Sequence, residues 1–142
     1  MPLLVNNLFS ITFPSSTDHL QKVESVCCEV AAEAGFDESG MDDLSIAITE
    51  LFNNAILHGN KNDASKNIVI TYTCSKTHLI VSIKDEGTGF KPEKIRDPLA
   101  PENLLAENGR GLYLAKNLMD DVKFNFSDDG TEVLIYKSLP KK

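Results

Sequence analysis

Two pairs of short alternating runs constrain the fold of this chain more than any other feature. Within each pair, apolar and polar side chains alternate on both sides of a short polar turn. The runs cover residues 68–74, 79–83, 122–126 and 133–136. Alternation with a period of two is typical of half-buried strands, and a short turn between two such runs predicts an antiparallel hairpin. Residues 8–13 have the same alternation and predict a further strand.

Helical patterns fill most of the remaining sequence. Apolar residues recur at steps of three and four over residues 17–34, 37–57 and 112–119, which predicts three amphipathic helices. Strands thus cluster with strands, and two of the helices are consecutive. We therefore predict the α+β class, with residues 1–142 as a single domain. The expected architecture is a two-layer sandwich, in which about three helices cover one face of a mixed, mostly antiparallel sheet.

Composition excludes several classes of protein. The chain has 14 basic and 21 acidic residues and a formal net charge of −7, which disfavours binding to nucleic acid or to an anionic membrane. Its beginning lacks the basic segment of a signal peptide, and no apolar stretch approaches 18 residues. We therefore expect a cytoplasmic protein. Cys27 and Cys28 lie in an apolar helical stretch, where we expect both to be small buried side chains.

The second helical pattern carries a line of polar residues. Glu50, Asn54 and His58 are spaced by four residues, so they lie roughly along one side of the helix. A carboxylate and an amide in this arrangement can hold a hydrated magnesium ion and orient a nucleophile, because magnesium prefers oxygen ligands and retains waters. Taken alone, the pattern favours a solvated helix face, since polar residues are normal on an amphipathic helix.

A second candidate follows the second run of the first hairpin, at Asp85-Glu86-Gly87-Thr88-Gly89. An aspartate at the end of a strand can accept a hydrogen bond from an exocyclic amine. Two glycines two residues apart let the backbone approach a ligand closely. A plain turn would have the same sequence, so this motif is only suggestive by itself.

A third candidate is Gly109-Arg110-Gly111, which comes directly before the third helical pattern. Free N–H groups and the positive end of the helix dipole favour phosphate binding at such a place, and Arg110 could add a charged contact. Nineteen residues separate Gly89 from Gly109, which is long for a structureless connection. Lys91 in this segment is available for phosphate oxygens, as are Lys94 and Arg96. A simple loop remains the alternative.

The order of these motifs resembles that of the GHKL, or Bergerat-fold, ATPases. Four segments resemble the N box, the two glycine boxes and the G-T element of that superfamily. They are residues 48–55, 85–89, 109–111 and 130–131. Within the superfamily, the chain is most similar to the anti-sigma factor serine kinases of bacterial partner-switching systems. This likeness is carried by T-E-x-x-x-N-A-I-x-H-G at Thr49 to Gly59 and by G-R-G-L at Gly109 to Leu112.

The resemblance implies a role for each matching position. Asn54 would coordinate Mg²⁺ that bridges the phosphates of ATP, and Glu50 would act as the general base or orient the attacking group. Asp85 would accept from the adenine amine, with Thr131 helping through a water. The remaining positions would shape the adenine pocket or meet the phosphates beneath a lid at about residues 91–108. These are Gly87, Gly89, Lys91, Gly109, Arg110 and Gly111. Whether Asn53 shares the role of Asn54 stays open, and His58 has no assigned role.

The resemblance also implies a function. Such kinases phosphorylate a serine or threonine of a STAS-domain anti-anti-sigma protein, bind a sigma factor or another regulator, and often form homodimers. Two alternatives remain at this point. The chain could be an ATP-dependent binding module that switches partners without phosphotransfer. It could also be the catalytic domain of a histidine kinase, although no helix with a phosphorylatable histidine precedes residue 48.

Overall fold

All strands of the described structure join one sheet. The computed structural model describes residues 3–87 and 109–140, with the backbone alone for residues 109–113. The strands are β1 (Leu8–Pro14), β2 (Asn67–Cys74), β3 (His78–Lys84), β4 (Asp121–Ser127) and β5 (Gly130–Ser138). Their order in the sheet is β1-β2-β3-β5-β4, and each neighbouring pair is antiparallel. Both predicted hairpins are therefore present, as β2–β3 and β4–β5.

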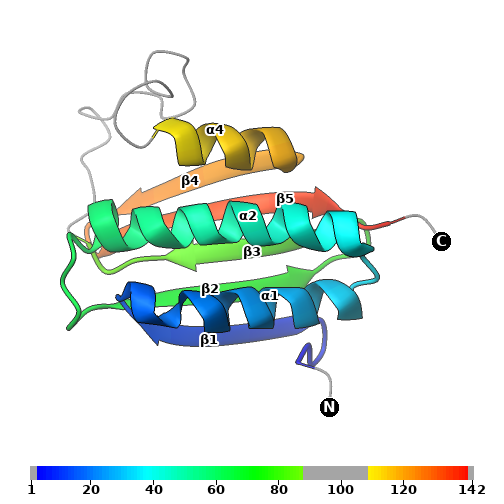
Figure 1. The fold of residues 1–142 in the computed structure, drawn as a ribbon, viewed down its shortest axis with the longest axis horizontal. Coiled ribbons are helices and arrows are strands. Elements are labelled where there is room, and N and C mark those ends of the chain that lie inside the picture. The colour runs from blue at the N-terminus through cyan, green and yellow to red at the C-terminus, as the bar shows by residue number, and fades with distance from the viewer. Residues whose placement is uncertain (1–2, 88–108, 141–142) are drawn as a thin grey trace.

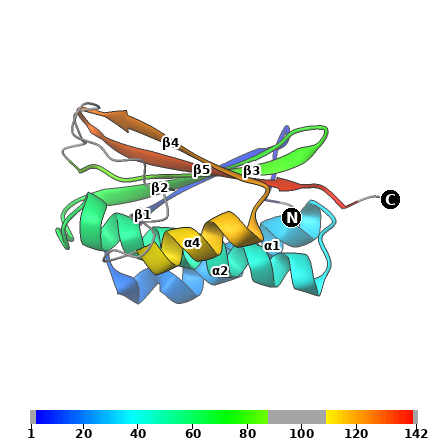
Figure 2. The same cartoon turned by 90° about the horizontal axis from the view of Figure 1, so that it is seen from above.

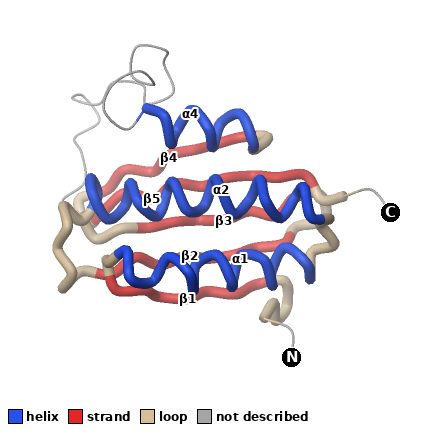
Figure 3. Tube along the Cα trace, in the orientation of Figure 1, coloured by secondary structure: helices blue, strands red, loops and turns tan. Residues whose placement is uncertain are grey.

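The helices lie in a second layer against one face of this sheet, as the view from above shows (Figure 2). They are the short η1 (Thr17–His19), α1 (Leu20–Glu33), α2 (Glu38–Asn54) with its π-helical continuation η2 (Ala55–Gly59), and α4 (Gly109–Leu118). α2 lies between α1 and α4 over the middle of the sheet (Figures 1 and 3). The predicted α+β sandwich is thus confirmed. Within the described residues, every helix is too short or too polar to cross a membrane.

Local signals in the sequence fix the ends of the first two helices. The hydroxyl of Ser16 accepts a hydrogen bond from the backbone N–H of Asp18 at the start of η1. The carboxylate of Asp37 accepts from the N–H of Gly40 at 2.9 Å and so caps α2. Gly35 has a φ of 94°, which ends α1 in a conformation that other residues rarely adopt.

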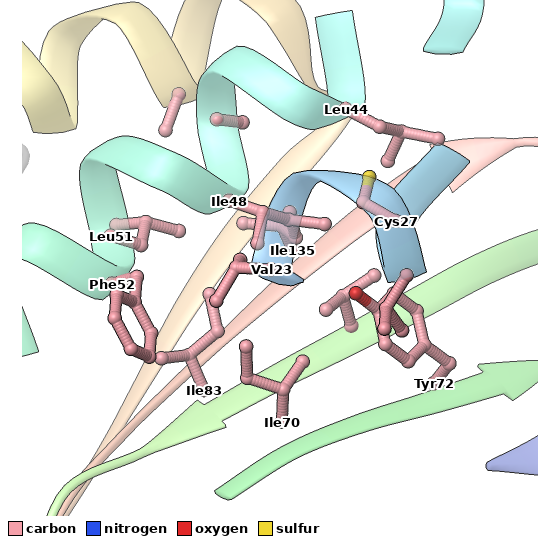
Figure 4. Packing of buried hydrophobic residues seen from close by; sticks show 14 of the residues in the cluster. Val23, Cys27, Leu44, Ile48, Leu51, Phe52, Ile70, Tyr72, Ile83 and Ile135 are labelled. Carbon is pink, nitrogen blue, oxygen red and sulfur yellow. The ribbon is translucent and has the colours of Figure 1, made fainter. Parts of the chain in front are cut away.

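The core lies between the inner face of the sheet and the stripes of α1 and α2. Figure 4 shows Phe52 and Ile48 of α2 facing the isoleucines of the central strands. Phe13 meets Phe52 edge-on, with ring centroids 5.7 Å apart. Cys27 is buried at 1% exposure, as expected. Cys28 is exposed, so the expectation that it is buried is wrong. It is one residue further around α1 and therefore misses the buried stripe.

Two helix boundaries differ from those expected. The helix expected to end at about residue 57 consists of α2, which ends at Asn54, and the π-helical turn η2, which reaches Gly59. α4 includes Gly109 instead of beginning at residue 112. Gly109, Arg110 and Gly111 therefore belong to the described first turn of the helix, and the expectation that they precede it is wrong.

One end of the sandwich collects the segments that carry the sequence motifs. In Figure 1 the end of α2, the end of β3 and the beginning of β5 lie together at the left. The described beginning of α4 lies toward the same side. Segments that are far apart in the sequence are thus brought to the same end of the sandwich, where a ligand could contact all of them.

Candidate nucleotide site

Asp85 lies at this end of the sandwich and contacts several of the segments that meet there. It is only 5% exposed, although it follows directly after the last residue of β3. One carboxylate oxygen, Oδ1, accepts from the N–H of Gly87 at 2.9 Å and from the N–H of Thr131 at 3.0 Å. A buried carboxylate with two backbone donors has a fixed orientation. Asp85 is therefore a preorganised acceptor rather than part of a loose turn.

The pairing of β3 with β5 explains why Thr131 reaches Asp85. Lys84 lies opposite Glu132 in the register, so the next pair in line is Asp85 with Thr131. The N–H of Asp85 donates to the carbonyl of Thr131 at 3.0 Å. Gly130 precedes this pair with a φ of 148°, and a Cβ atom there would lie 2.1 Å from the carbonyl oxygen of Asp85. The G-T element thus supports Asp85 through its backbone.

Two further glycines bring the end of α2 against the same carboxylate. A Cβ atom at Gly59 would lie 2.0 Å from Oδ2 of Asp85. A Cβ atom at Gly87 would lie 2.1 Å from the carbonyl oxygen of Gly59. Neither position can carry a side chain without displacing its neighbour. The first glycine box and the last residue of η2 are therefore in direct contact.

Asn60 is a residue of the site that the sequence analysis did not identify. It is 0% exposed, and its side-chain Oδ1 accepts from the N–H of Glu86 at 2.8 Å. Its Nδ2 donates to the carbonyl of Asn67 at 3.1 Å. No sequence signal distinguishes such an amide from an ordinary asparagine after a helix, because both of its partners come from other elements.

Glu50 and Asn54 lie four residues apart on α2, and both are half-buried. The carboxylate and the amide thus share one side of the helix, as expected. Among the side chains that the structure describes, those of residues 3–87 and 114–140, neither finds a hydrogen-bonding partner, so both are available to a ligand. Asn53 is also half-buried, so its share in the role of Asn54 stays open, whereas His58 is exposed.

The donor set fits a magnesium nucleotide. In the described part of the chain, His, Cys, Asp and Glu side chains form no cluster of three that could enclose a metal. Mg²⁺ does not need such a cluster, since it usually retains waters and takes one or two protein oxygens together with phosphate oxygens. Asn54 and Glu50 offer oxygens of that kind. Asp85, in contact with Gly59, Gly87 and Gly130, offers a carboxylate acceptor in a fixed position.

Some predicted positions cannot be placed. Gly89, Lys91 and the expected lid at residues 91–108 lie outside the described residues. For Gly109, Arg110 and Gly111 the structure gives the helical backbone alone. The structure therefore brings Asp85, Gly87 and Thr131 together, and the phosphate-binding roles remain predictions.

Comparison with known proteins assigns the family. A family model described as a histidine kinase-like ATPase domain matches residues 13–137. The chain belongs to this family. The ATPase domain is 26% identical over 144 residues to serine-protein kinase RsbW of Listeria monocytogenes, with 97% of this chain and 91% of the relative covered. It is 32% identical over 118 residues to the protein of that name from Oceanobacillus iheyensis, with 79% of this chain and 75% of the relative covered.

Solved structures agree with this assignment. The RsbU and RsbW domains of Rv1364c from Mycobacterium tuberculosis match with a TM-score of 0.68 and 22% identity, over 95% of this chain and 34% of that one. The catalytic domain of the histidine kinase ThkA matches with a TM-score of 0.59 and 14% identity, over 94% of this chain and 99% of that one. At these identities the likeness shows the fold of the ATPase domain and nothing finer.

Proposed function

We propose that this chain is an ATP-dependent serine/threonine-protein kinase that phosphorylates a STAS-type anti-anti-sigma protein and also sequesters a sigma factor or another regulator. The observation that carries the proposal is the fixed acceptor Asp85 in direct contact with the end of the helix that bears Glu50 and Asn54. The names of the relatives support the kinase activity, because serine-protein kinases align over most of this chain. The fold alone would not support it, since a histidine kinase catalytic domain has the same fold.

Each residue would have a defined part in the reaction. Asp85 accepts from the exocyclic amine of adenine and so fixes the base. The oxygen of Asn54 would hold the magnesium ion, which would neutralise charge on the phosphates when bound. Glu50 takes the proton of the substrate hydroxyl. The hydroxyl oxygen bonds to the γ-phosphorus as the bond from that phosphorus to ADP breaks. Phosphoryl transfer asks a protein mainly for positioning and charge compensation, and these residues provide both.

The test is transfer from labelled ATP to the STAS-domain proteins of the same organism. The unaltered chain should label a serine or threonine of one of them. Glu50→Gln keeps the size of the side chain but removes the base, so it should lower the rate by roughly 10²–10⁴ with little change in nucleotide affinity. Asn54→Ala should lose magnesium-dependent affinity and transfer together. Lys22→Ala, at an exposed position of α1, is the control.

Other outcomes decide between the alternatives. ATP binding without transfer to any STAS-domain protein would favour a binding module that switches partners. Transfer to a histidine would favour a histidine kinase catalytic domain. The protein would be cytoplasmic and homodimeric, and it would bind neither nucleic acid nor membranes. Sedimentation of the purified chain, with and without ATP, measures the oligomeric state.

A further inference from the structure

Gly59 has no backbone reason to be a glycine. It closes the π-helical turn η2, and the glycines with positive φ in the described structure are Gly35 and Gly130. In a helical conformation alanine is more stable than glycine. The space around its Cα explains the residue instead, since a Cβ atom would lie 2.0 Å from Oδ2, 2.3 Å from Cγ and 2.8 Å from Cβ of Asp85. The glycine is therefore required by the position of the Asp85 carboxyl group.

Asn60 fixes the distance between the same two segments. Its backbone N–H donates to the carbonyl of Ala55 at 2.7 Å and its carbonyl accepts from Asp63 at 3.0 Å. Its side chain bonds to Glu86 on one side and to Asn67 on the other. The carboxylate of Glu86 in turn accepts from the N–H of Asn67. The end of η2, the start of β2 and the segment after β3 are thus joined through one fully buried amide.

We propose that Gly59 and Asn60 are positioning residues that hold the carboxyl group of Asp85 for adenine. Gly59 leaves the space that the carboxyl group occupies, and Asn60 holds the neighbouring Glu86 at a fixed distance from the end of η2. Because η2 continues α2, the pair also ties the adenine acceptor to the helix that carries Glu50 and Asn54. The inference rests on the proposed ATP site and adds to it the residues that select the base.

The contact itself is tested without nucleotide. Gly59→Ala should lower the melting temperature by at least about 4 °C, because the new methyl group displaces the carboxyl group. In an Asp85→Gly background the methyl group has room, so Gly59→Ala should then shift the melting temperature by less than about 1 °C. Equal shifts in both backgrounds would overturn the contact. If Gly59→Ala fails to fold, folding of the double variant supports the contact, and failure of the double variant while Asp85→Gly alone folds overturns it.

The positioning role is tested by base selectivity. Asn60→Ala leaves the N–H of Glu86 without its partner. It should weaken ATP binding by about 10- to 100-fold and lower the preference for ATP over GTP. General damage to the fold would weaken the binding of ATP and of GTP equally and leave the ratio of the two affinities unchanged. Asn117→Ala, at an exposed position of α4, is the control and should bind as the unaltered chain does.

The outcomes separate two failures. If the unaltered chain binds neither nucleotide, the proposed function is wrong and the inference fails with it. If the unaltered chain prefers ATP and Asn60→Ala keeps both the affinity and the preference, the proposed function stands and the positioning role is wrong.

Discussion

At the scale of single residues, the site depends on glycines, which have no side chain, as much as on residues with functional side chains. The proximity of Asp85 and Gly87 could be predicted from the sequence, because a carboxylate at a strand end followed by glycines is a recognisable pattern. The role of Gly59 could not, because it depends on an approach between η2 and the end of β3 that only the fold creates. Asn60 was missed for the same reason, since both partners of its amide lie on other elements.

Gly130 offers a residue-scale prediction. Gly130→Ala should lower the free energy of unfolding by at least about 2 kcal/mol, because it combines a strained φ with a clash against the Asp85 backbone. Gly35→Ala is the matched control: its φ is also positive, but no atom lies within 4 Å of the added Cβ. It should cost only about 1–2 kcal/mol. Urea unfolding of both variants measures the difference, and a smaller loss for Gly130→Ala than for Gly35→Ala would contradict it.

The two adjacent cysteines should differ in reactivity. Burial raises the pKa of the Cys27 thiol to about 12, so almost none of it is thiolate at neutral pH. Cys28 is exposed. In a Cys74→Ser background, a disulfide reagent should modify Cys28 in the folded protein and reach Cys27 only after unfolding. Cys27→Ala and Cys28→Ala variants assign the signal to one cysteine. Rapid modification of Cys27 in the native state would contradict the packing of this face of α1 against the core.

At the scale of elements, helices were predicted better than their ends. The apolar stripe of α2 follows from the three- and four-residue steps of its sequence, and its residues Leu44, Ile48, Leu51 and Phe52 are buried. Its π-helical end does not follow from the sequence, because it depends on the hydrogen bond from the N–H of Asn60 to Ala55 and on the long-range partners of the Asn60 amide. π-helical turns often occur at functional sites, and this one carries Gly59.

The other end of the helical layer supports a prediction at this scale. The ammonium group of Lys137 donates to the carbonyl of Leu118 at the end of α4 at 3.3 Å and lies 3.7 Å from the Asp43 carboxylate of α2. Its side chain is only 17% exposed, so solvent screens the contact weakly. Lys137→Met should lower the free energy of unfolding by about 1–2 kcal/mol. Lys116→Met, at an exposed position of α4, should change it by less than about 0.5 kcal/mol.

At the scale of the whole molecule, the hairpins and the class were predictable, but the sheet order was not. Each hairpin joins neighbouring segments, so local pattern is enough to predict it. The pairings of β1 with β2 and of β3 with β5 join segments that are distant in the sequence. The second of these pairings places Thr131 beside Asp85. From the residues alone the two motifs were separate signals, and only the resemblance to a family connected them.

Acid should destabilise the molecule through carboxylates that accept hydrogen bonds. Bonds from Ser138, first from its hydroxyl and then from its N–H, lower the pKa of Asp120. The hydroxyl of Ser127 and the charge of Lys84 do the same for Asp129. Lowered pKa values in the folded state mean that this stabilisation is present above about pH 4 and is lost as the pH falls through them. Asp120→Asn should therefore lose less stability than the unaltered chain on acidification below about pH 4. Identical pH curves in thermal unfolding would contradict this.

The most direct test of the account is calorimetric titration of Mg²⁺–ATP into the unaltered chain and into Asp85→Asn. Two backbone N–H groups hold Oδ1 of Asp85, so the oxygen of an asparagine should take that place and its amide N–H₂ the place of Oδ2. A donor would then face the donor of adenine. We predict saturable binding by the unaltered chain and an affinity at least about tenfold lower in Asp85→Asn. Absence of both heat and thermal stabilisation at millimolar ATP would contradict the account.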